Sequence, residues 1–323
     1  MMKIVDTHYD LGPILYNRYA KGESDVIKNV LLPEWRDNQV QLIVAAVFVS
    51  DHFVYDSPLR HALDQIALIK NEIKGLEELM LVLDRASLDK ALNENKIGII
   101  LSLEGLEPIG SDLNLLDIFY DLGIRAAGLT WSRQNAVADG SRFEGENTDN
   151  GLTHFGKKAV KKMRELGMLV DVSHLNDAGL DELSGKLFAS HSNAREINKI
   201  TRNLSTEHLR KIKASSGIIG INGIKPIVGG GIDTLCDHID YMRDLLGSEH
   251  ICFGLDKCND LEVNGLRYGN EEIEEIDVIA DYKDLEEVRK ILRKRSYTEE
   301  EIEGIFYKNF ISFLKGCFNE NNQ

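Results

Sequence analysis

Short runs rich in valine and isoleucine alternate along this chain with longer stretches in which apolar residues recur every three or four positions. Eight of the short runs predict β-strands, at residues 3–8, 42–50, 97–105, 124–131, 168–174, 187–192, 217–224 and 251–256. Continuous apolar runs are typical of parallel strands covered on both faces, and their alternation with helices implies right-handed βα units. The pattern therefore predicts an α/β fold, a (β/α)8 TIM barrel, with an open doubly wound sheet as the alternative.

Three amphipathic stretches between the predicted strands are helix candidates. Residues 57–73 begin with Ser-Pro, a typical helix start, and carry leucine and isoleucine on one face. Residues 153–167 end in a basic turn and a glycine, and residues 232–247 also end in a glycine, as helix C-termini commonly do. The acidic segment 262–288 is predicted to be a loop followed by closing helices. Because no Ser- or Pro-rich linker interrupts it, the chain (1–323) is expected to form a single domain with extra C-terminal helices.

Ionisable side chains stand at the carboxyl ends of five of the predicted strands. In chain order these residues are His8, Asp10, Glu104, His174, His191 and Asp256. In a barrel those ends share one rim, the face that carries active sites. Imidazole and carboxylate groups are typical ligands of divalent metals such as zinc. The joint pattern therefore predicts a metal site more specifically than any one of these residues does.

Each of these residues also has an ordinary structural explanation. His8 and Asp10 would also fit a strand that runs into a polar turn. Glu104 could cap a helix, and His174 could be a hydrogen-bonded loop residue. Asp6, one step deeper on the same face as His8, is expected to orient His8 by a hydrogen bond behind the metal. The other histidines are interpreted as structural or surface residues, with His238 near the barrel wall: His52, His61, His154, His208, His238 and His250.

Composition narrows the function classes. The chain has 323 residues, is 43% hydrophobic and carries a formal net charge of −15, which disfavours binding to nucleic acid or to anionic membranes. The four cysteines form no CxxC pair, so neither a thiolate zinc site nor a disulfide framework is predicted. No apolar run approaches the ~20 residues of a membrane span. We also expect no secretory signal, because the first predicted strand begins at residue 3. We expect a cytoplasmic protein.

Several motifs together resemble those of a known family. "DTHYD", "LEG", "GLTHFGKKAVKKMRELGMLVDVSH", "ASHSNAR", "TRN" and "GLD" occur in the order and rough spacing of the membrane (renal-type) dipeptidases. These belong to the metallopeptidase branch of the amidohydrolase superfamily. The resemblance covers nearly the whole chain, and its most specific part is the block that ends in "LGMLVDVSH", followed by "SHS".

The resemblance implies a (β/α)8 barrel with two zinc ions per subunit that share one carboxylate. By motif, His8 and Asp10 resemble the ligands of the first ion. Glu104 resembles the bridge, and His174 and His191 resemble the ligands of the second ion. Two cations that share a water would lower its pKa far below ~15.7 and so supply hydroxide near neutral pH. Family members commonly form dimers, so the resemblance is compatible with a homodimer, and the sequence leaves the oligomeric state open.

The substrate side of the site shows both matches and departures. Asp256 resembles the family's catalytic acid/base, and Arg202 in "TRN" resembles the arginine that binds the terminal carboxylate of the dipeptide. Trp131 stands where mammalian-type members carry a histidine that contacts the substrate, which indicates an altered substrate fit. After the last strand, Lys257 is expected to bring a charge near the rim, and Asp260 to act as a displaced second carboxylate.

The leading hypothesis is a dinuclear zinc dipeptidase that hydrolyses small dipeptides, including those with a C-terminal D-residue. A second hypothesis is an amidohydrolase that acts on N-acyl amino acids or lactones. The same metal ions would supply the nucleophile for these reactions, and the shape of the pocket would determine which substrate is accepted. A third is a metal-binding barrel without catalysis, which only Trp131 and Lys257 favour.

Overall fold

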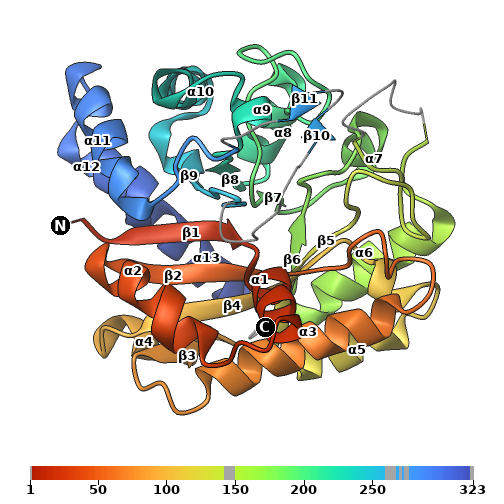
Figure 1. The fold of residues 1–323 in the computed structure, drawn as a ribbon. Helices are drawn as coiled ribbons and strands as arrows, with labels where there is room; N and C mark the ends of the chain where they lie inside the picture. The colour runs from red at the N-terminus through yellow and green to blue at the C-terminus, as the bar shows by residue number, and fades with distance from the viewer. Residues whose placement is uncertain (1, 142–149, 259–266, 269–270, 273–275, 321–323) are drawn as a thin grey trace.

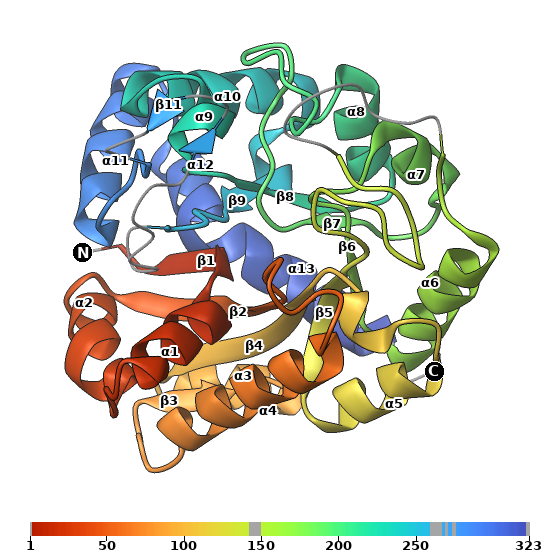
Figure 2. The ribbon, with the colours of Figure 1, turned by 45° about the vertical axis from the view of Figure 1, so that its right-hand side comes forward.

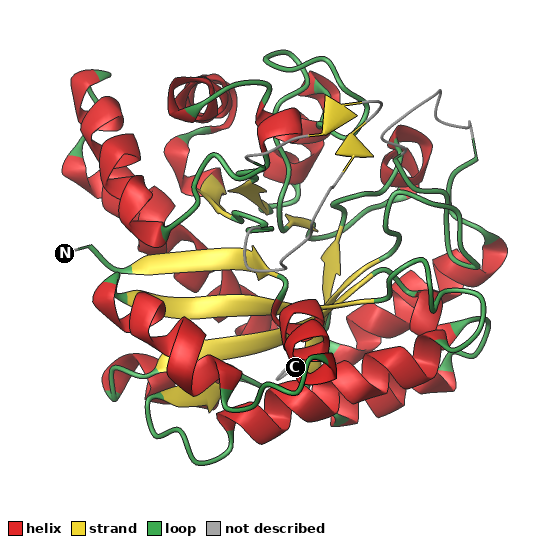
Figure 3. Ribbon diagram, in the orientation of Figure 1, coloured by secondary structure: helices red, strands yellow, loops and turns green. Residues whose placement is uncertain are grey.

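The strands of the computed structural model form a closed barrel (Figures 1 and 3). The structure describes residues 2–141, 150–258, 267–268, 271–272 and 276–320. Every strand of the barrel runs parallel to both neighbours, and the pairing of β2 with β4 closes the ring. In ring order the strands are β1 (Ile4–Tyr9), β2 (Val40–Phe48), β4 (Ile97–Glu104), β5 (Ile124–Gly128), β6 (Leu169–Asp171), β7 (Phe188–Ala189), β8 (Ile218–Ile221) and β9 (Ile251–Phe253). The predicted (β/α)8 barrel is confirmed, and the open doubly wound sheet is excluded.

Helices surround the barrel, as Figure 2 shows from a second side. They are α1 (Leu11–Ala20), α2 (Leu32–Asp37), α3 (Pro58–Ile73), α4 (Arg85–Asn93), α5 (Asn114–Asp121), α6 (His154–Leu166), α7 (Asp177–Glu182), α8 (Thr206–Ala214), α9 (Lys225–Val228), α10 (Ile232–Leu246), α11 (Leu285–Lys294), α12 (Glu299–Glu303) and α13 (Asn309–Glu320). The three predicted helices are confirmed as α3, α6 and α10. At the end of α6, Gly167 adopts φ 75°, a left-handed cap that glycine takes without a Cβ penalty.

The core has two parts, on the two faces of the strands. The outward faces pack against the surrounding helices in one large apolar cluster. The inward faces form a second cluster together with the C-terminal helix α13, whose Phe310 and Leu314 are fully buried. Inward residues of that cluster include Val5 and Leu42, both near the amino ends of their strands. We infer that α13 closes the amino end of the barrel and leaves the carboxyl end open for a site.

The structure corrects several details of the predicted elements. β6 and β7 are shorter than predicted, so His174 and His191 lie in the turns that follow them rather than on strands. Asp10 is likewise past the end of β1 and is the N-cap of α1. A short strand was missed: β3 (Leu79–Leu81) pairs with the first residues of β4, on the edge that β5 occupies further along.

The sequence predicts a loop for the first part of the acidic segment, but the structure shows that this part also contains strands. The strands β10 (Arg267–Tyr268) and β11 (Glu271–Glu272) pair in antiparallel orientation. Three closing helices follow, α11 to α13, as expected from the sequence. None of the helices in the described part of the chain combines the length and apolar character needed to cross a lipid bilayer.

Candidate active site

Three carboxylates surround one imidazole at the carboxyl end of the barrel. The Nε2 atom of His8 lies 3.7 Å from Asp10 Oδ1, 3.6 Å from Glu104 Oε1 and 3.7 Å from Asp256 Oδ1. All four residues are largely buried; His8, in β1, is 2% exposed. These separations exceed a hydrogen bond, yet each acceptor faces the same nitrogen. The atoms therefore surround a point without occupying it, as the ligands of a cation do.

A second group of potential metal ligands also includes the carboxylate of Glu104. The Nε2 atoms of His174 and His191 lie 2.8 Å apart, and Glu104 Oε1 lies 3.2 Å from the first and 3.5 Å from the second. Two tetrahedral ligands at zinc's usual bond length would lie roughly 3.3 Å apart. The spacing of these three atoms is close to that value. Glu104 consequently belongs to both groups, as a bridging ligand would.

Two buried polar atoms of the first group support its use by a cation. His8 Nε2 and Asp10 Oδ1 are buried and form no hydrogen bond with the described residues. Asp10 is the N-cap of α1, where aspartate usually accepts a backbone hydrogen bond, but its side chain caps nothing. Buried polar atoms without partners are costly. A divalent cation would satisfy both atoms, so the residues present fit the metal that the sequence predicts.

The electrostatics of the site point the same way. Although burial lowers it, the pKa of His8 is raised to about 10 by the surrounding carboxylates, above all that of Glu104. Burial raises the pKa of Glu104 well above its usual range, and it raises the pKa of Asp256 to about 7. Burial also lowers the pKa values of His174 and His191 far below their usual range. A proton on His8 thus provides the positive charge that these carboxylates require, and a metal ion would provide more.

A hydroxyl group fixes the orientation and tautomer of His191. Ser190 Oγ donates to the Asp171 carboxylate, and it lies 2.6 Å from His191 Nδ1. Because an ionised carboxylate only accepts, the Ser190 proton goes to Asp171, and His191 Nδ1 must donate to Ser190. The lone pair of His191 is therefore on Nε2, which faces Glu104. Sequence reasoning missed Ser190 and Asp171, although both lie in the "LVDVSH" and "ASHS" blocks.

Asp256 is held by its own contacts rather than by a strand. Its backbone has φ 57°, in the left-handed region, which is uncommon for a residue other than glycine. Its N–H donates to the carbonyl of His8 at 3.2 Å. The side-chain amide of Asn222, just after β8, donates to Oδ2 at 2.9 Å, so Oδ1 is the oxygen that faces His8. His174 also has a positive φ, of 64°. Such strain is frequent at functional sites.

Asp6 contacts His8 differently from what was expected. Its Oδ1 accepts from the backbone N–H groups of His8 at 3.2 Å and Leu255 at 2.9 Å, not from the imidazole ring. Its Oδ2 accepts from the Tyr282 hydroxyl at 2.7 Å. Asp6 therefore ties β1 to the chain after β9 and so fixes the backbone that carries His8. Tyr282, which the sequence did not indicate, completes this arrangement.

A cavity of about 390 Å³ opens over the cluster. Asp10, Glu104, His174 and Asp256 contribute to its floor, and aromatic residues, among them Trp131, form much of its lining. The Trp131 ring packs 4.9 Å from that of Phe48 and is stacked 5.7 Å from that of His174. The cavity therefore combines a polar, metal-compatible floor with an apolar wall, as small-molecule sites commonly do.

Comparison with known proteins identifies the family. The model of the membrane dipeptidase family, peptidase family M19, matches residues 1–322. The chain belongs to this family. Its members are metal-dependent hydrolases that act as dipeptidases, which accords with a buried cluster of imidazoles and carboxylates beneath a small cavity.

Individual relatives are similar over nearly the whole chain. An uncharacterized dipeptidase of Schizosaccharomyces pombe is 28% identical over 97% of this chain and 80% of its own length. Human dipeptidase 3 is also 28% identical over 97% of this chain, which spans only 64% of that longer protein. Among solved structures, dipeptidase AC, a metallopeptidase of family M19, has a TM-score of 0.84 at 24% identity, covering 98% of this chain and 99% of that one.

One solved structure carries a bound dipeptide mimic. It is a metallopeptidase from Rhodobacter sphaeroides liganded with a phosphinate mimic of L-Ala-D-Ala. Its TM-score is 0.82 at 23% identity, and the match covers 98% of this chain and 99% of that one. At this identity the likeness shows the shared fold.

Two charged residues singled out in this M19 chain lie deeper than expected. Arg202 is 3% exposed and does not line the cavity; it donates to the carbonyl of His191 at 2.8 Å and to Ser192 Oγ at 3.1 Å. Lys257 is 1% exposed, and its Nζ donates to Glu34 Oε1, in α2, at 2.7 Å. The expectation that Lys257 brings a charge to the rim is therefore wrong, because its charge is directed to Glu34.

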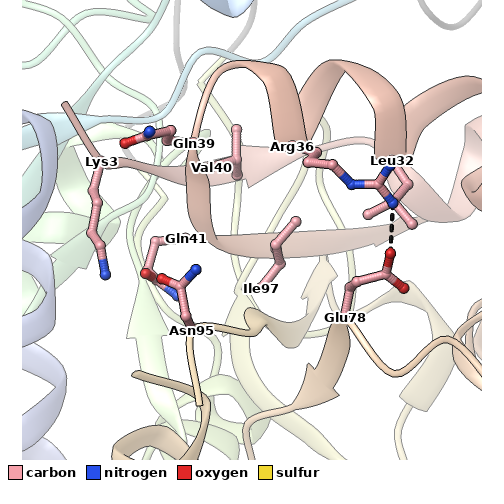
Figure 4. A pocket seen from close by; sticks show the side chains of 9 residues that line it. All are labelled: Lys3, Leu32, Arg36, Gln39, Val40, Gln41, Glu78, Asn95 and Ile97. Atoms are coloured by element: carbon pink, nitrogen blue, oxygen red, sulfur yellow. Dashed lines mark hydrogen bonds and ion pairs between the residues drawn. The ribbon is translucent and has the colours of Figure 1, made fainter. Parts of the chain in front are cut away.

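The outcome differs among the other residues considered from the sequence. Asp260 lies outside the described residues. His238 is fully buried in α10 and contacts the Ala194 N–H and the Val228 carbonyl through its two ring nitrogens, as a structural histidine does. His61, by contrast, was set aside as structural but lines the cavity, stacked 4.0 Å from Phe53. The hollow in Figure 4 is a different one, since it lies where β2 and β4 begin, at the opposite end of the barrel.

Proposed function

We propose that this M19 protein is a dinuclear zinc dipeptidase that hydrolyses small dipeptides with a free terminal carboxylate. The observation that supports it most strongly is the position of Glu104, whose Oε1 lies within 3.6 Å of the Nε2 atoms of three histidines. One carboxylate placed among three imidazoles is the arrangement that a pair of ions with a shared ligand requires. Borderline-to-hard nitrogen and oxygen ligands suit zinc.

The ligands divide into two sets. His8, Asp10 and Glu104 would hold the first ion, and Glu104, His174 and His191 the second. Zinc bound there would acidify a shared water and polarise the carbonyl of the scissile peptide bond. Ser190 holds His191 in the tautomer that presents a lone pair, which is the state a metal ligand needs.

Asp256 would carry the proton. Its Oδ2 is engaged by Asn222, which leaves Oδ1 to accept a proton from the attacking water and to return it to the leaving amine. Burial raises its pKa to about 7 in the metal-free protein. Zinc ions beside it would lower this pKa and so keep Asp256 in the carboxylate form that accepts a proton.

The substrate would lie in the cavity above this cluster. A dipeptide fits a space of about 390 Å³, and Trp131 with its aromatic neighbours would contact a side chain. Arg202 does not line the cavity, so it would act on the terminal carboxylate through its charge rather than by direct contact, as it acts on Glu104 and Asp256. A C-terminal D-residue is included in the proposal because the Rhodobacter sphaeroides metallopeptidase is liganded with a mimic of L-Ala-D-Ala.

A substrate panel combined with metal analysis tests the proposal. Purified protein is assayed on L,L- and L,D-dipeptides, on the same dipeptides with a blocked amino group, and on N-acyl amino acids and lactones. We expect hydrolysis of free dipeptides, loss of activity on chelation and recovery with zinc at two equivalents per chain. Preference for the blocked or N-acyl substrates would favour the other amidohydrolase reaction. Metal binding without turnover of any of these compounds would contradict the proposal.

A further inference from the structure

Three aromatic rings form a part of the cavity wall to which the reaction proposed above assigns no role. Tyr16 comes from α1, Phe53 from the segment between β2 and α3, and His61 from the first turn of α3. The imidazole of His61 is stacked on the ring of Phe53 with 4.0 Å between ring centres, and it meets the ring of Tyr16 nearly at right angles at 4.4 Å. All three residues line the cavity, and together they are called the His61 subsite.

One nitrogen of the His61 ring has no hydrogen-bond partner. The residue is only 5% exposed, and its Nδ1 atom is buried and makes no hydrogen bond with the described residues. A buried polar atom without a partner is costly. A histidine that serves the fold is paired, as His238 is through both of its ring nitrogens. The imidazole of His61 therefore lacks the contacts of a structural histidine and lies where a molecule in the cavity would meet it.

The next turn of α3 fixes the position of His61. Gln65 lies four residues further on, on the same face of the helix. Its Nε2 donates to the carbonyl of Phe48 at 2.5 Å, and its Oε1 accepts from the N–H of Phe48 at 3.1 Å. The ring of Phe48 in turn packs 4.9 Å from that of Trp131. The His61 subsite is thus held in a defined position relative to the aromatic lining above the metal-compatible floor.

The chemistry of the His61 subsite is polar but neutral. Burial lowers the pKa of His61, so the imidazole is neutral at pH 7. Two carboxylates of the adjoining segments are each paired with an arginine: Asp51 accepts from Arg133 at 2.7 Å, and both oxygens of Asp64 accept from Arg60 at 2.8 Å. A neutral imidazole carries one N–H donor and one lone pair. A carboxamide also carries a donor and an acceptor, so it can pair with the ring in either tautomer.

We propose that the His61 subsite makes this dipeptidase selective for a substrate side chain that ends in a carboxamide, as those of asparagine and glutamine do. This inference rests on the proposed dipeptide substrate and adds to it the identity of one side chain. The amide would form a hydrogen bond with the His61 ring, and the apolar body of the side chain would pack on Tyr16 and Phe53. An apolar side chain of the same size gains the packing but leaves the imidazole unpaired, so it should be a poorer substrate.

The test compares dipeptides that are nearly equal in size and differ at the end of one side chain. One set pairs alanine with asparagine, leucine or aspartate, and a second, longer set pairs alanine with glutamine, methionine or glutamate. Each dipeptide is made in both orders, so that both substrate positions and two side-chain lengths are covered. Ala-Ala reports on hydrolysis itself, because neither of its side chains has a polar end. The ratio of kcat/KM between the amide and apolar members of a set measures selectivity.

The variants remove the nitrogens of one ring. His61→Phe keeps a ring against Phe53 without a hydrogen-bonding atom, and His61→Leu is a second nitrogen-free variant in case the first folds poorly. His250→Phe is the matched control, since His250 Nδ1 contacts the carbonyl of Gly217 at 2.8 Å and the residue lies just before β9, outside the cavity lining. Thermal unfolding establishes that each protein is folded before its kinetics are measured.

We expect wild type to hydrolyse an amide dipeptide of one set and order with kcat/KM roughly 5- to 100-fold above that of its apolar counterpart, mainly through KM. This preference should disappear in a folded nitrogen-free variant and persist in His250→Phe. A wild type without amide preference in either order and at either length would overturn the proposal. So would a preference that survives in a folded nitrogen-free variant, or a stronger preference for the acidic member of the set. A wild type that hydrolyses none of the dipeptides, Ala-Ala included, would instead contradict the proposed function.

Discussion

The guanidinium of Arg133 lies 5.0 Å from the centre of the Trp131 ring, on which it packs as a cation on an aromatic face. The same guanidinium donates to Asp51 Oδ1 and to the Val49 carbonyl, both at 2.7 Å, and its Nε lies 3.3 Å from Glu107 Oε1. Arg133 thus connects the segments that follow β2, β4 and β5. It positions the aromatic wall of the cavity without lining the cavity itself.

Replacing Arg133 should therefore alter substrate selection more than chemistry. In Arg133→Lys the ammonium group cannot reproduce the planar contact with Trp131 or the several directed hydrogen bonds. We expect KM for dipeptides with large side chains to rise, lowering kcat/KM roughly 2- to 30-fold, with a smaller effect on kcat and on small dipeptides. Steady-state kinetics on a dipeptide series measures this.

Arg125→Lys provides a matched control for this variant. Arg125 also packs on an aromatic ring, 3.8 Å from the centre of Tyr120, and donates to backbone carbonyls, but near the start of β5. It should cost stability without changing the ranking of substrates. Equal shifts for all substrates in Arg133→Lys would contradict the positioning role.

Loss of the Ser190 hydroxyl should weaken metal binding. In Ser190→Ala, His191 Nδ1 loses its acceptor, so the tautomer with the lone pair on Nε2 is no longer enforced. Changes of this kind behind a ligand typically cost 10- to 100-fold in metal affinity, and we expect about that loss for one of two zinc equivalents. Competition with a chromophoric chelator measures it. Ser205→Ala is the control, since Ser205 Oγ also contacts a histidine, His208, at 3.0 Å but caps α8, and His208 is not one of the proposed ligands.

The Ser205 control should lose about 1 kcal/mol of stability as a lost helix cap and keep full zinc affinity. Unchanged affinity in Ser190→Ala would show that the hydroxyl does not control the ligand state of His191.

Much of this arrangement could be predicted from local sequence. Glu104 was found because an apolar strand delivers it to the rim, a relation that the period of two along a strand makes visible. His8 reaches the same rim although it lies three residues after the inward-facing Val5, because the register of β1 is irregular between Asp6 and Tyr9. The strand argument was weaker for Asp10, which belongs to the start of α1, and for His174, whose turn has a positive φ. The strand-end pattern nevertheless indicated both residues, and the family motifs then supported them.

The remaining parts depend on contacts between distant segments. Arg133 and Glu107 are separated in sequence and meet only because two loops fold over one rim. From the sequence, Lys257 was expected to place a positive charge at the site. The direction of its side chain, however, depends on the position of α2, which carries Glu34. No periodicity in the sequence specifies either pairing. For this reason the strands and the proposed ligands could be predicted from the sequence, whereas the contacts of the residues around them could not.

An ion pair behind the site should contribute to stability at neutral pH and lose that contribution in acid. Arg195 donates to both oxygens of Asp177 at 2.7 Å. Although partial burial raises it, the pKa of Asp177 is lowered overall by these hydrogen bonds and by the charge of Arg195. A carboxyl group whose folded pKa lies below its unfolded value stabilises the fold above the unfolded pKa, near 3.8, and the contribution vanishes as the pH falls through the folded pKa.

In Asp177→Asn the free energy of unfolding at pH 7 should fall by only about 0.5–1 kcal/mol, since solvent screens a half-exposed carboxylate. The difference from wild type should shrink steadily below pH ~4. Urea unfolding of both proteins between pH 7 and pH 3 checks the sign. A difference that grows in acid would be incompatible with the lowered pKa.

The most demanding prediction concerns Glu104, whose carboxylate is costly for the fold and necessary for the site. Burial raises its pKa well above the usual range, so the metal-free protein should gain stability in Glu104→Gln, by about 1 kcal/mol. The same change removes the shared ligand, and hydrolysis should fall by roughly 10²–10³-fold or more, as losses of a central electrostatic group do.

Glu72→Gln offers the opposite case to Glu104→Gln. Its buried carboxylate accepts from Tyr19 and from two backbone N–H groups, so the change should cost about 1–3 kcal/mol and leave zinc content unaltered. Thermal unfolding of the metal-free proteins, zinc analysis and a dipeptide assay together separate the two carboxylates: stability and metal content should change in opposite directions for Glu104, whereas only stability should change for Glu72. Glutamine at position 104 with two bound zinc ions and the wild-type rate would show that the carboxylate does not bridge the ions.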